Sequence, residues 1–264
     1  MRSIRVEITS VNGSAPRDAG TAMQVWHDGS AGTIGGGALE HRAMATARRM
    51  LAEGREDHAE TVPLGPGLGQ CCGGAVRLRY TRGGEMPVDR RARPLPAELL
   101  GSAHGSLWLW GAGHVGRAMV DCLAPTGTFE ITWIDSAADR FPADVPSGVT
   151  VLPTAEMPRL ATRADPAAHH LIFTYSHDID LALCAALLRR GFGSCGLIGS
   201  ATKWARFQKR LRAMQLDPSD IVCPIGDPAQ GKHPDEIAHS TATALLRRTM
   251  DLTDSAPRKQ VAHG

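Results

Sequence analysis

Two adjacent cysteines in a glycine-rich segment are the first residues of this chain that could do chemistry. Residues 69–74 read Gly-Gln-Cys-Cys-Gly-Gly, so Cys71 and Cys72 lie between Gln70 and Gly73. Glycine amides and a neighbouring arginine favour the thiolate form of a cysteine. A thiolate binds soft metals and can carry sulfur. We therefore interpret Cys71 and Cys72 as candidate metal ligands. The alternative is a pair of small buried residues.

The other cysteines favour structural roles. Cys122, Cys184, Cys195 and Cys223 lie in or beside apolar segments, where burial is expected. Disulfides are not expected, because a chain of 264 residues does not need them and its compartment is predicted to be reducing. No spacing typical of a zinc site occurs. We expect free thiols throughout.

A second glycine motif predicts a nucleotide-type turn. The apolar segment 107–110 leads into Gly111, Gly113 and Gly116 at GxGxxG spacing, and a helix is predicted to follow. These positions allow a tight turn, a close approach of phosphate to the backbone, and close packing of helix on strand. Asp135 ends the next strand, about 20 residues on, where an acid would bind ribose hydroxyls. The alternative is that the glycines serve only the turn and Asp135 is a surface charge.

Further candidate anion contacts lie in three other loops. Gly35, Gly36 and Gly37 precede a helix and would expose several amides to a phosphate or oxyanion. His177 follows a later strand, at the end where open α/β sheets bind ligands. Ser200 and Lys203 follow another strand, although Ser200 could equally be a plain helix N-cap.

The elements that must position these residues fall into two groups. In the first group, residues 4–11 alternate as a strand, residues 21–34 predict two short strands around Asp28-Gly29, and residues 39–51 have helical spacing. Residues 76–80 predict one more strand. In the second group, strands are expected at 107–110, 130–134, 149–152, 170–174, 194–198 and 221–223, and helices near 115–124, 178–190, 201–214 and 234–249. The alternation of strands and helices predicts a parallel, doubly wound sheet.

The fold class is therefore α/β, with a small N-terminal α/β domain and a C-terminal Rossmann-like doubly wound parallel sheet. The expected ranges are 1–82 for the first domain, 83–105 for a linker, 106–250 for the Rossmann-like domain and 251–264 for a flexible tail. The linker is rich in proline, glycine and arginine and has no hydrophobic period.

Composition narrows the class of protein. Apolar residues make up 42% and charged residues 21%, which is typical of a globular protein. The net charge of +2 gives no general attraction for nucleic acid. No long uncharged apolar segment predicts a membrane helix, and the first residues lack the apolar region of a signal peptide. A cytoplasmic protein that binds neither membrane nor nucleic acid is expected.

Taken together, the motifs are similar to those of a known family. From about Val6 to Arg248 the chain resembles the XdhC family of xanthine dehydrogenase accessory proteins, also described as the XdhC/CoxI family. The segments that carry the resemblance occur in the family's order and read GSAPRDAGTAMQVW, GTIGGGALE, GLGQCCGG, WGAGHVGRA, GLIGSATKWARFQKRL and VCPIG…GKHPDEIA. The combination of CCGG with GAGHVG is specific, whereas neither half alone is.

The resemblance implies a non-catalytic chaperone of the molybdenum cofactor, Mo-molybdopterin. Such proteins protect the cofactor, support its sulfuration with a cysteine desulfurase, and pass it to the xanthine dehydrogenase apoenzyme. Cys71 and Cys72 would contact the metal end of the cofactor or hold sulfur on its way there. A homodimer is compatible with this picture, and the Rossmann cleft could hold the cofactor or a separate nucleotide.

Two other functions stay open at this point. An NAD(P)-dependent oxidoreductase is supported by Gly111, Gly113 and Asp135, but Tyr80 and Tyr175 are the only tyrosines and neither forms a Tyr-x-x-x-Lys pair. A sulfur-transfer protein that uses Cys71 and Cys72 is the other alternative, with the Rossmann region as a docking module.

Overall fold

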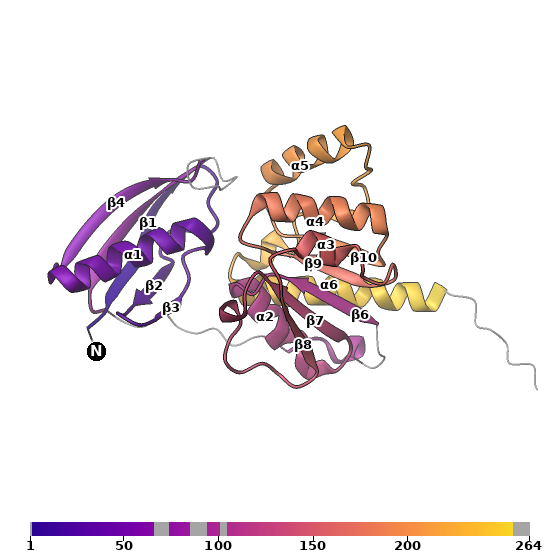
Figure 1. Cartoon of the computed structure of the whole chain (residues 1–264). Helices are drawn as coiled ribbons and strands as arrows, with labels where there is room; N and C mark the ends of the chain where they lie inside the picture. Colours follow the sequence, from indigo (N-terminus) through magenta and orange to yellow (C-terminus); the bar gives the residue numbers. More distant parts are fainter. Residues whose placement is uncertain (1, 66–73, 85–93, 101–104, 256–264) are drawn as a thin grey trace, which may run out of the picture.

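The computed structural model describes residues 2–65, 74–84, 94–100 and 105–255, and side chains up to residue 250. Two sheets organise the chain, one in each predicted domain (Figure 1). The mixed α/β fold predicted from the sequence is confirmed.

The N-terminal part is an antiparallel sheet covered by one helix. Its strands have the order β3-β2-β1-β5-β4. The apolar residues of α1 and of the sheet share one core, so α1 covers that face of the sheet (Figure 1). The helix ends at Gly54, whose φ of 71° is left-handed, which glycine adopts without strain. The elements are β1 (Ile4–Asn12), β2 (Ala22–Val25), β3 (Ser30–Gly32), α1 (Gly37–Glu53), β4 (Asp57–Pro63) and β5 (Ala75–Arg82).

Strand β4 was not predicted from the sequence. It is an edge strand that pairs only with β5, and Val62 is its only buried residue. A strand that buries one side chain carries almost no hydrophobic alternation, so its pattern does not differ from that of a polar loop.

The C-terminal part is a six-stranded parallel sheet with the order β8-β7-β6-β9-β10-β11. This is the doubly wound order in which the first strand lies beside the fourth, so the winding reverses between β6 and β9. The strands are β6 (Ser106–Trp110), β7 (Glu130–Asp135), β8 (Val149–Pro153), β9 (His169–Ile172), β10 (Ser194–Leu197) and β11 (Ile221–Val222).

Helices cover both faces of the parallel sheet (Figure 1). One core joins the sheet to α2 and α6, and the other joins it to α3, α4 and α5. The bounds are α2 (His114–Leu123), α3 (Met157–Ala161), α4 (His177–Arg190), α5 (Ala201–Ala213) and α6 (Pro234–Ser255). Helix α3 has five residues, too few to show a helical period in the sequence.

Two predicted boundaries differ from the structure. The end of the predicted linker contains a short 3₁₀ helix, η2 (Ala97–Leu99), which packs against α6. Leu95 and Leu99 are buried in the core of the parallel sheet, so this segment belongs to the second domain. Helix α6 runs to Ser255, into the range expected for the tail.

Candidate functional site

A cavity of about 840 Å³ lies between the two domains, at the carboxyl ends of the parallel strands. Its second-domain wall contains residues that follow β6, β9 and β10, including both sides of the point where the strand order reverses. Its first-domain wall contains the glycine segment before α1 and part of the loop after β1. The predicted site residues that line it are Gly35, Gly36, Gly37, Gly113, Asp135, His177, Ser200 and Lys203. Open α/β sheets bind ligands at this position.

The glycine turn after β6 has the geometry that its spacing predicts. Gly111 has a φ of 121°, and a Cβ there would lie 2.5 Å from the carbonyl oxygen of Phe173. A Cβ on Gly116 would overlap the carbonyl oxygen of Gly111, so the start of α2 packs directly on the turn. Gly113 is the N-cap residue of α2 and has open space where its Cβ would be. Of the three glycines, only Gly113 lines the cavity.

Replacing Gly116 with alanine should therefore lower the free energy of unfolding by about 2–3 kcal/mol, because the new methyl group overlaps backbone atoms. Gly113→Ala is the matched control. Gly113 has a φ of −74°, which any residue can adopt, and a Cβ there would contact no other atom. The expected loss of unfolding free energy in this control is therefore under about 1 kcal/mol. Urea unfolding of the two variants measures the difference. Equal stabilities would contradict the packing role of Gly116.

Asp135 is buried and holds the glycine turn together. Its Oδ2 accepts a hydrogen bond from the amide of Ala112 at 2.6 Å, and its Oδ1 accepts from the amide of Ser136 at 2.6 Å. Arg140 Nε lies 3.5 Å from Oδ1. The carboxylate is not a surface charge, because its side chain is only 2% exposed. Its contact with ribose hydroxyls stays a prediction, since that contact would have to compete with these donors.

The glycine segment before α1 already holds an anion, which is the side chain of Glu40. Its Oε2 accepts from the amides of Ile34 and Gly36, both at 3.1 Å, and from Thr33 Oγ1 at 2.6 Å. Its Oε1 lies 2.7 Å from His114 Nε2 at the start of α2. The sequence predicts a phosphate or oxyanion on the amides of Gly35, Gly36 and Gly37. The structure corrects this for the amide of Gly36, whose acceptor, like that of Ile34, is the chain's own carboxylate.

Lys203 and Ser200 also have partners within the chain. Lys203 Nζ donates to Asp180 Oδ2 at 2.6 Å and to the carbonyl oxygen of Ile198 at 2.9 Å. The side chains of Lys203 and Asp180 are 5% and 0% exposed. Ser200 Oγ accepts from the amide of Lys203, so Ser200 is the N-cap of α5. Direct binding of an external anion by Lys203 is thus not supported by its contacts.

His177 is half-buried at the start of α4 and lines the cavity. Burial lowers the pKa of its imidazole below 6.5, and the positive charge of Lys203 lowers it further. The ring is therefore mainly neutral near pH 7. A neutral imidazole can accept a hydrogen bond or bind a metal.

The cavity wall contains basic side chains beside acidic ones. The basic residues are Arg17, Arg117, Arg140, Lys203 and Lys232, and the acidic residues are Glu40, Asp135, Asp139 and Asp178. Arg117 donates to the carbonyl oxygens of Ala112 and Arg140, at 3.1 and 2.9 Å. Lys232 binds Asp18 at 2.7 Å, and Arg17 donates to the carbonyl oxygen of Lys232 at 3.3 Å. The contacts of Lys232 connect the two domains. Arg17, Arg117 and Lys232 were not predicted as site residues, because isolated basic residues, whether in a loop or on a helix, give no pattern in the sequence.

The predicted cysteine site, Gln70, Cys71, Cys72 and Gly73, lies outside the described residues. Its flanks are described, and the amide of Leu64 donates to the carbonyl oxygen of Gly74 at 2.8 Å. Gly74 packs against the backbone of Asn12 and Ser14, in the loop that continues to the cavity-lining Pro16. Gly74, the first described residue after the cysteines, therefore lies beside that loop.

The described cysteines are free thiols that are largely buried, as predicted. Burial raises the pKa of Cys122 to about 11 and that of Cys223 to about 12. It also raises the pKa of Cys184 and Cys195. These four thiols stay protonated and are poor metal ligands. Within the described part of the chain, no group of three or more His, Cys, Asp or Glu side chains could hold a metal ion.

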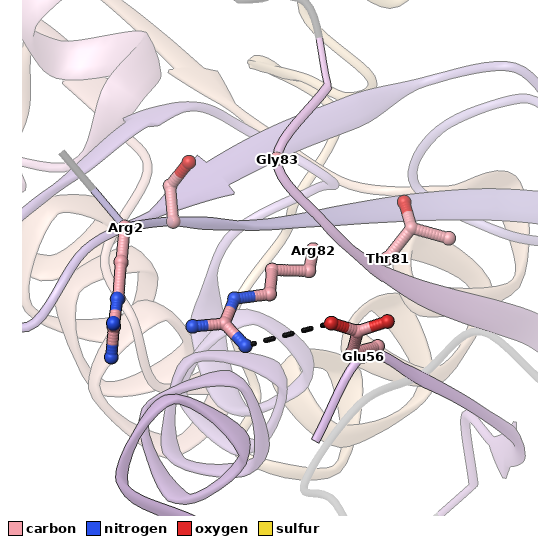
Figure 2. A pocket seen from close by; sticks show the side chains of 6 residues that line it. Arg2, Glu56, Thr81, Arg82 and Gly83 are labelled. Atoms are coloured by element: carbon pink, nitrogen blue, oxygen red, sulfur yellow. Dashed lines mark ion pairs between the residues drawn. The ribbon is translucent and has the colours of Figure 1, made fainter. Parts of the chain in front are cut away.

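A second cavity, of about 430 Å³, lies in the N-terminal domain where β1 begins and β5 ends (Figure 2). Figure 2 shows the ion pair between Arg82 and Glu56 in its wall, at 3.8 Å. Glu56 is 81% exposed, and the cavity contains none of the predicted site residues. The interdomain cavity is therefore the candidate site.

Comparison with known families decides the classification. Residues 107–245 match the XdhC Rossmann domain, and residues 2–62 match the XdhC and CoxI family. The chain belongs to the XdhC family. The glycine turn, Asp135 and the His177 loop lie in the XdhC Rossmann domain, and the Glu40 segment lies in the other matched region.

Individual relatives of this XdhC family chain are distant. It is 26% identical over 249 residues to the uncharacterized protein YqeB of Escherichia coli K12, covering 91% of this chain and 42% of YqeB. The chain thus spans less than half the length of that relative. A structure titled as a xanthine dehydrogenase from Bacillus halodurans is 17% identical, with a TM-score of 0.49, covering 100% of this chain and 94% of that one. The E. coli tRNA N6-threonylcarbamoyladenosine dehydratase TcdA is 16% identical, with a TM-score of 0.39, covering 61% and 90%.

Among the described residues, none forms a helix with the length and apolar character needed to cross a membrane.

Proposed function

We propose that this chain is an accessory protein of the xanthine dehydrogenase system that carries the molybdenum cofactor as cargo. Membership of the XdhC family supports the role in that system. The chaperone would not itself be an enzyme. It would hold the cofactor, support its sulfuration with a cysteine desulfurase, and release it to the xanthine dehydrogenase apoenzyme.

The observation that carries the proposal is the interdomain cavity. Its volume of about 840 Å³ suits a cofactor-sized ligand. Residues of the first turns of α2, α4 and α5 line it, and α2 has no side-chain cap, so its N-terminal amides are available to a phosphate. Arg17, Arg117 and Arg140 add positive charge to its wall. The cofactor has a terminal phosphate, which this wall would bind.

The soft metal end of the cofactor needs a thiolate, and the described cysteines are protonated. The sequence predicts that role for Cys71 and Cys72. Gly74, the first described residue after them, packs beside the loop that leads to the cavity-lining Pro16. These thiols would contact the metal or hold the sulfur that a desulfurase supplies. A nucleotide as a separate occupant of the Rossmann cleft, and a homodimer, stay predictions.

The test is the cofactor content of the protein purified from a cofactor-replete host supplied with molybdate. We expect the wild type to retain molybdopterin, and Cys71→Ala or Cys72→Ala to carry about tenfold less molybdenum. Cys122→Ala is the matched control, because Cys122 is buried at the far end of α2. Pterin fluorescence and elemental analysis give the two contents.

A folded wild type without molybdopterin would contradict the proposal. Tight NADH binding with hydride transfer would then favour the oxidoreductase. A persulfide trapped on Cys71 or Cys72 without any pterin would favour the sulfur-transfer protein.

A further inference from the structure

Tyr175 presents an aromatic ring to the interdomain cavity. Its side chain is 55% exposed, and in the described part of the chain no other Tyr, Trp or Phe is exposed. It follows β9 and precedes α4, so it lies at the point where the strand order reverses. Aromatic side chains are common in the walls of ligand pockets.

The backbone on both sides of Tyr175 is held in place. Thr174 Oγ1 donates to the carboxylate of Asp180 at 2.7 Å and accepts from the amide of Ser176 at 3.2 Å. The amide of Thr174 also donates to Asp180, at 3.2 Å. Ser176 in turn caps α4 through the amide of Ile179. The ring of Tyr175 is thus presented by a fixed segment.

A guanidinium group supports the ring. Arg140 Cζ lies 5.3 Å from the centroid of the Tyr175 ring, within the range of a cation–π contact. Arg140 is itself held by Asp135 at 3.5 Å, and its carbonyl oxygen accepts from Arg117 at 2.9 Å. Asp135 and Arg117 both bind Ala112 of the glycine turn. The ring is therefore linked through three side chains to the turn that begins α2.

We propose that Tyr175, supported by Arg140, is a stacking platform for the planar heterocycle of a phosphate-bearing ligand. Aromatic side chains bind the faces of heterocycles in this way. Arg140 occupies one side of the ring, and a heterocycle would cover the exposed part. The inference rests on the proposed function for the identity of the heterocycle, which is then a pterin. A purine nucleotide has the same chemistry, and the experiment separates the two.

The experiment titrates the full-length protein with three probes: 6-hydroxymethylpterin, guanosine monophosphate and ribose 5-phosphate. The variants are Tyr175→Ala, and Tyr175→Phe as the matched control that keeps the ring. We expect Tyr175→Ala to bind the pterin about tenfold more weakly, with Tyr175→Phe within about twofold of the wild type. Ribose 5-phosphate has no aromatic ring, so its Kd should be the same in all three proteins. Pterin fluorescence and calorimetry measure the affinities.

Three other outcomes separate the platform from the cofactor proposal, and a fourth overturns both. If Tyr175→Ala binds the pterin as tightly as the wild type does, the platform is wrong and the cofactor proposal is unaffected. An equal loss of ribose 5-phosphate binding would also overturn the platform, because Tyr175 would then only shape the loop. If the wild type binds guanosine monophosphate through Tyr175 but not the pterin, the platform stands and the cofactor proposal fails. Binding of neither heterocycle overturns both.

Discussion

Replacing Lys203 with methionine should lower the free energy of unfolding by about 3–5 kcal/mol. The Lys203 ammonium group forms a buried ion pair with Asp180, with 2.6 Å between Nζ and Oδ2. Removal of the cation leaves the Asp180 carboxylate, which is 0% exposed, without its charge partner. An unpaired charge in the low-dielectric interior destabilises the folded state strongly. Asp180 also accepts from Thr174, so the loop that presents Tyr175 should loosen in this variant.

Urea unfolding measures this loss, and a second substitution identifies its cause. An asparagine in place of Asp180 is neutral, and its amide oxygen could still accept from Thr174. Adding Asp180→Asn to Lys203→Met should therefore recover most of the stability. Lys209→Met is the matched control, because Lys209 is exposed on the same helix. If Lys203→Met were as stable as Lys209→Met, the ion pair would not hold α4 and α5 together.

Replacing Glu40 with alanine should lower the free energy of unfolding by about 2–4 kcal/mol. The Glu40 carboxylate accepts from Thr33, Ile34 and Gly36 and contacts His114 of the other domain. Alanine leaves these buried donors without an acceptor. Calorimetric unfolding measures the loss. His114→Gln removes only the interdomain partner and should cost less.

The Glu40 carboxylate should also make the stability of the protein depend on pH. Burial raises the pKa of Glu40, but the hydrogen bond and charge of His114, with the donors Thr33 and Gly36, lower it below 4.5. A pKa that folding lowers adds stability above the unfolded value and loses it as the pH falls through the folded value. The stability difference between wild type and Glu40→Gln should therefore be full at pH 7 and shrink below pH 4.5. A difference that is constant down to about pH 3 would contradict this.

Much of the fold could be predicted from local pattern. Strands such as β6 and β7 are short apolar segments, and helices such as α5 carry a clear apolar stripe, so their types and approximate bounds follow from periodicity. Gly111, Gly113 and Gly116 show by their spacing alone where the turn lies. The pattern fails where burial is slight, as in the edge strand β4, and where an element is short, as in α3.

The partners of the site residues could not be predicted in this way. Gly35–Gly37 and Lys203 line the cavity, yet the sequence does not show that Glu40 occupies the amides of Ile34 and Gly36 or that Asp180 binds Lys203. These contacts join residues from different turns, helices or domains, and distance along the chain says nothing about them. Tyr175 and Arg140 are likewise far apart in the sequence and meet only because β7 and β9 both lie next to β6.

The sequence by itself determined the α/β class, the doubly wound sheet, the glycine turn and the family, because each depends on residue type at a fixed local spacing. The tertiary structure decided which charges are already neutralised within the chain and which groups stay available to a ligand. The physical reason is that a charge in a protein is either solvated or paired, and the pairing partner is set by packing. Glu40, Asp135 and Lys203 are paired, whereas the ring of Tyr175 remains exposed in the cavity.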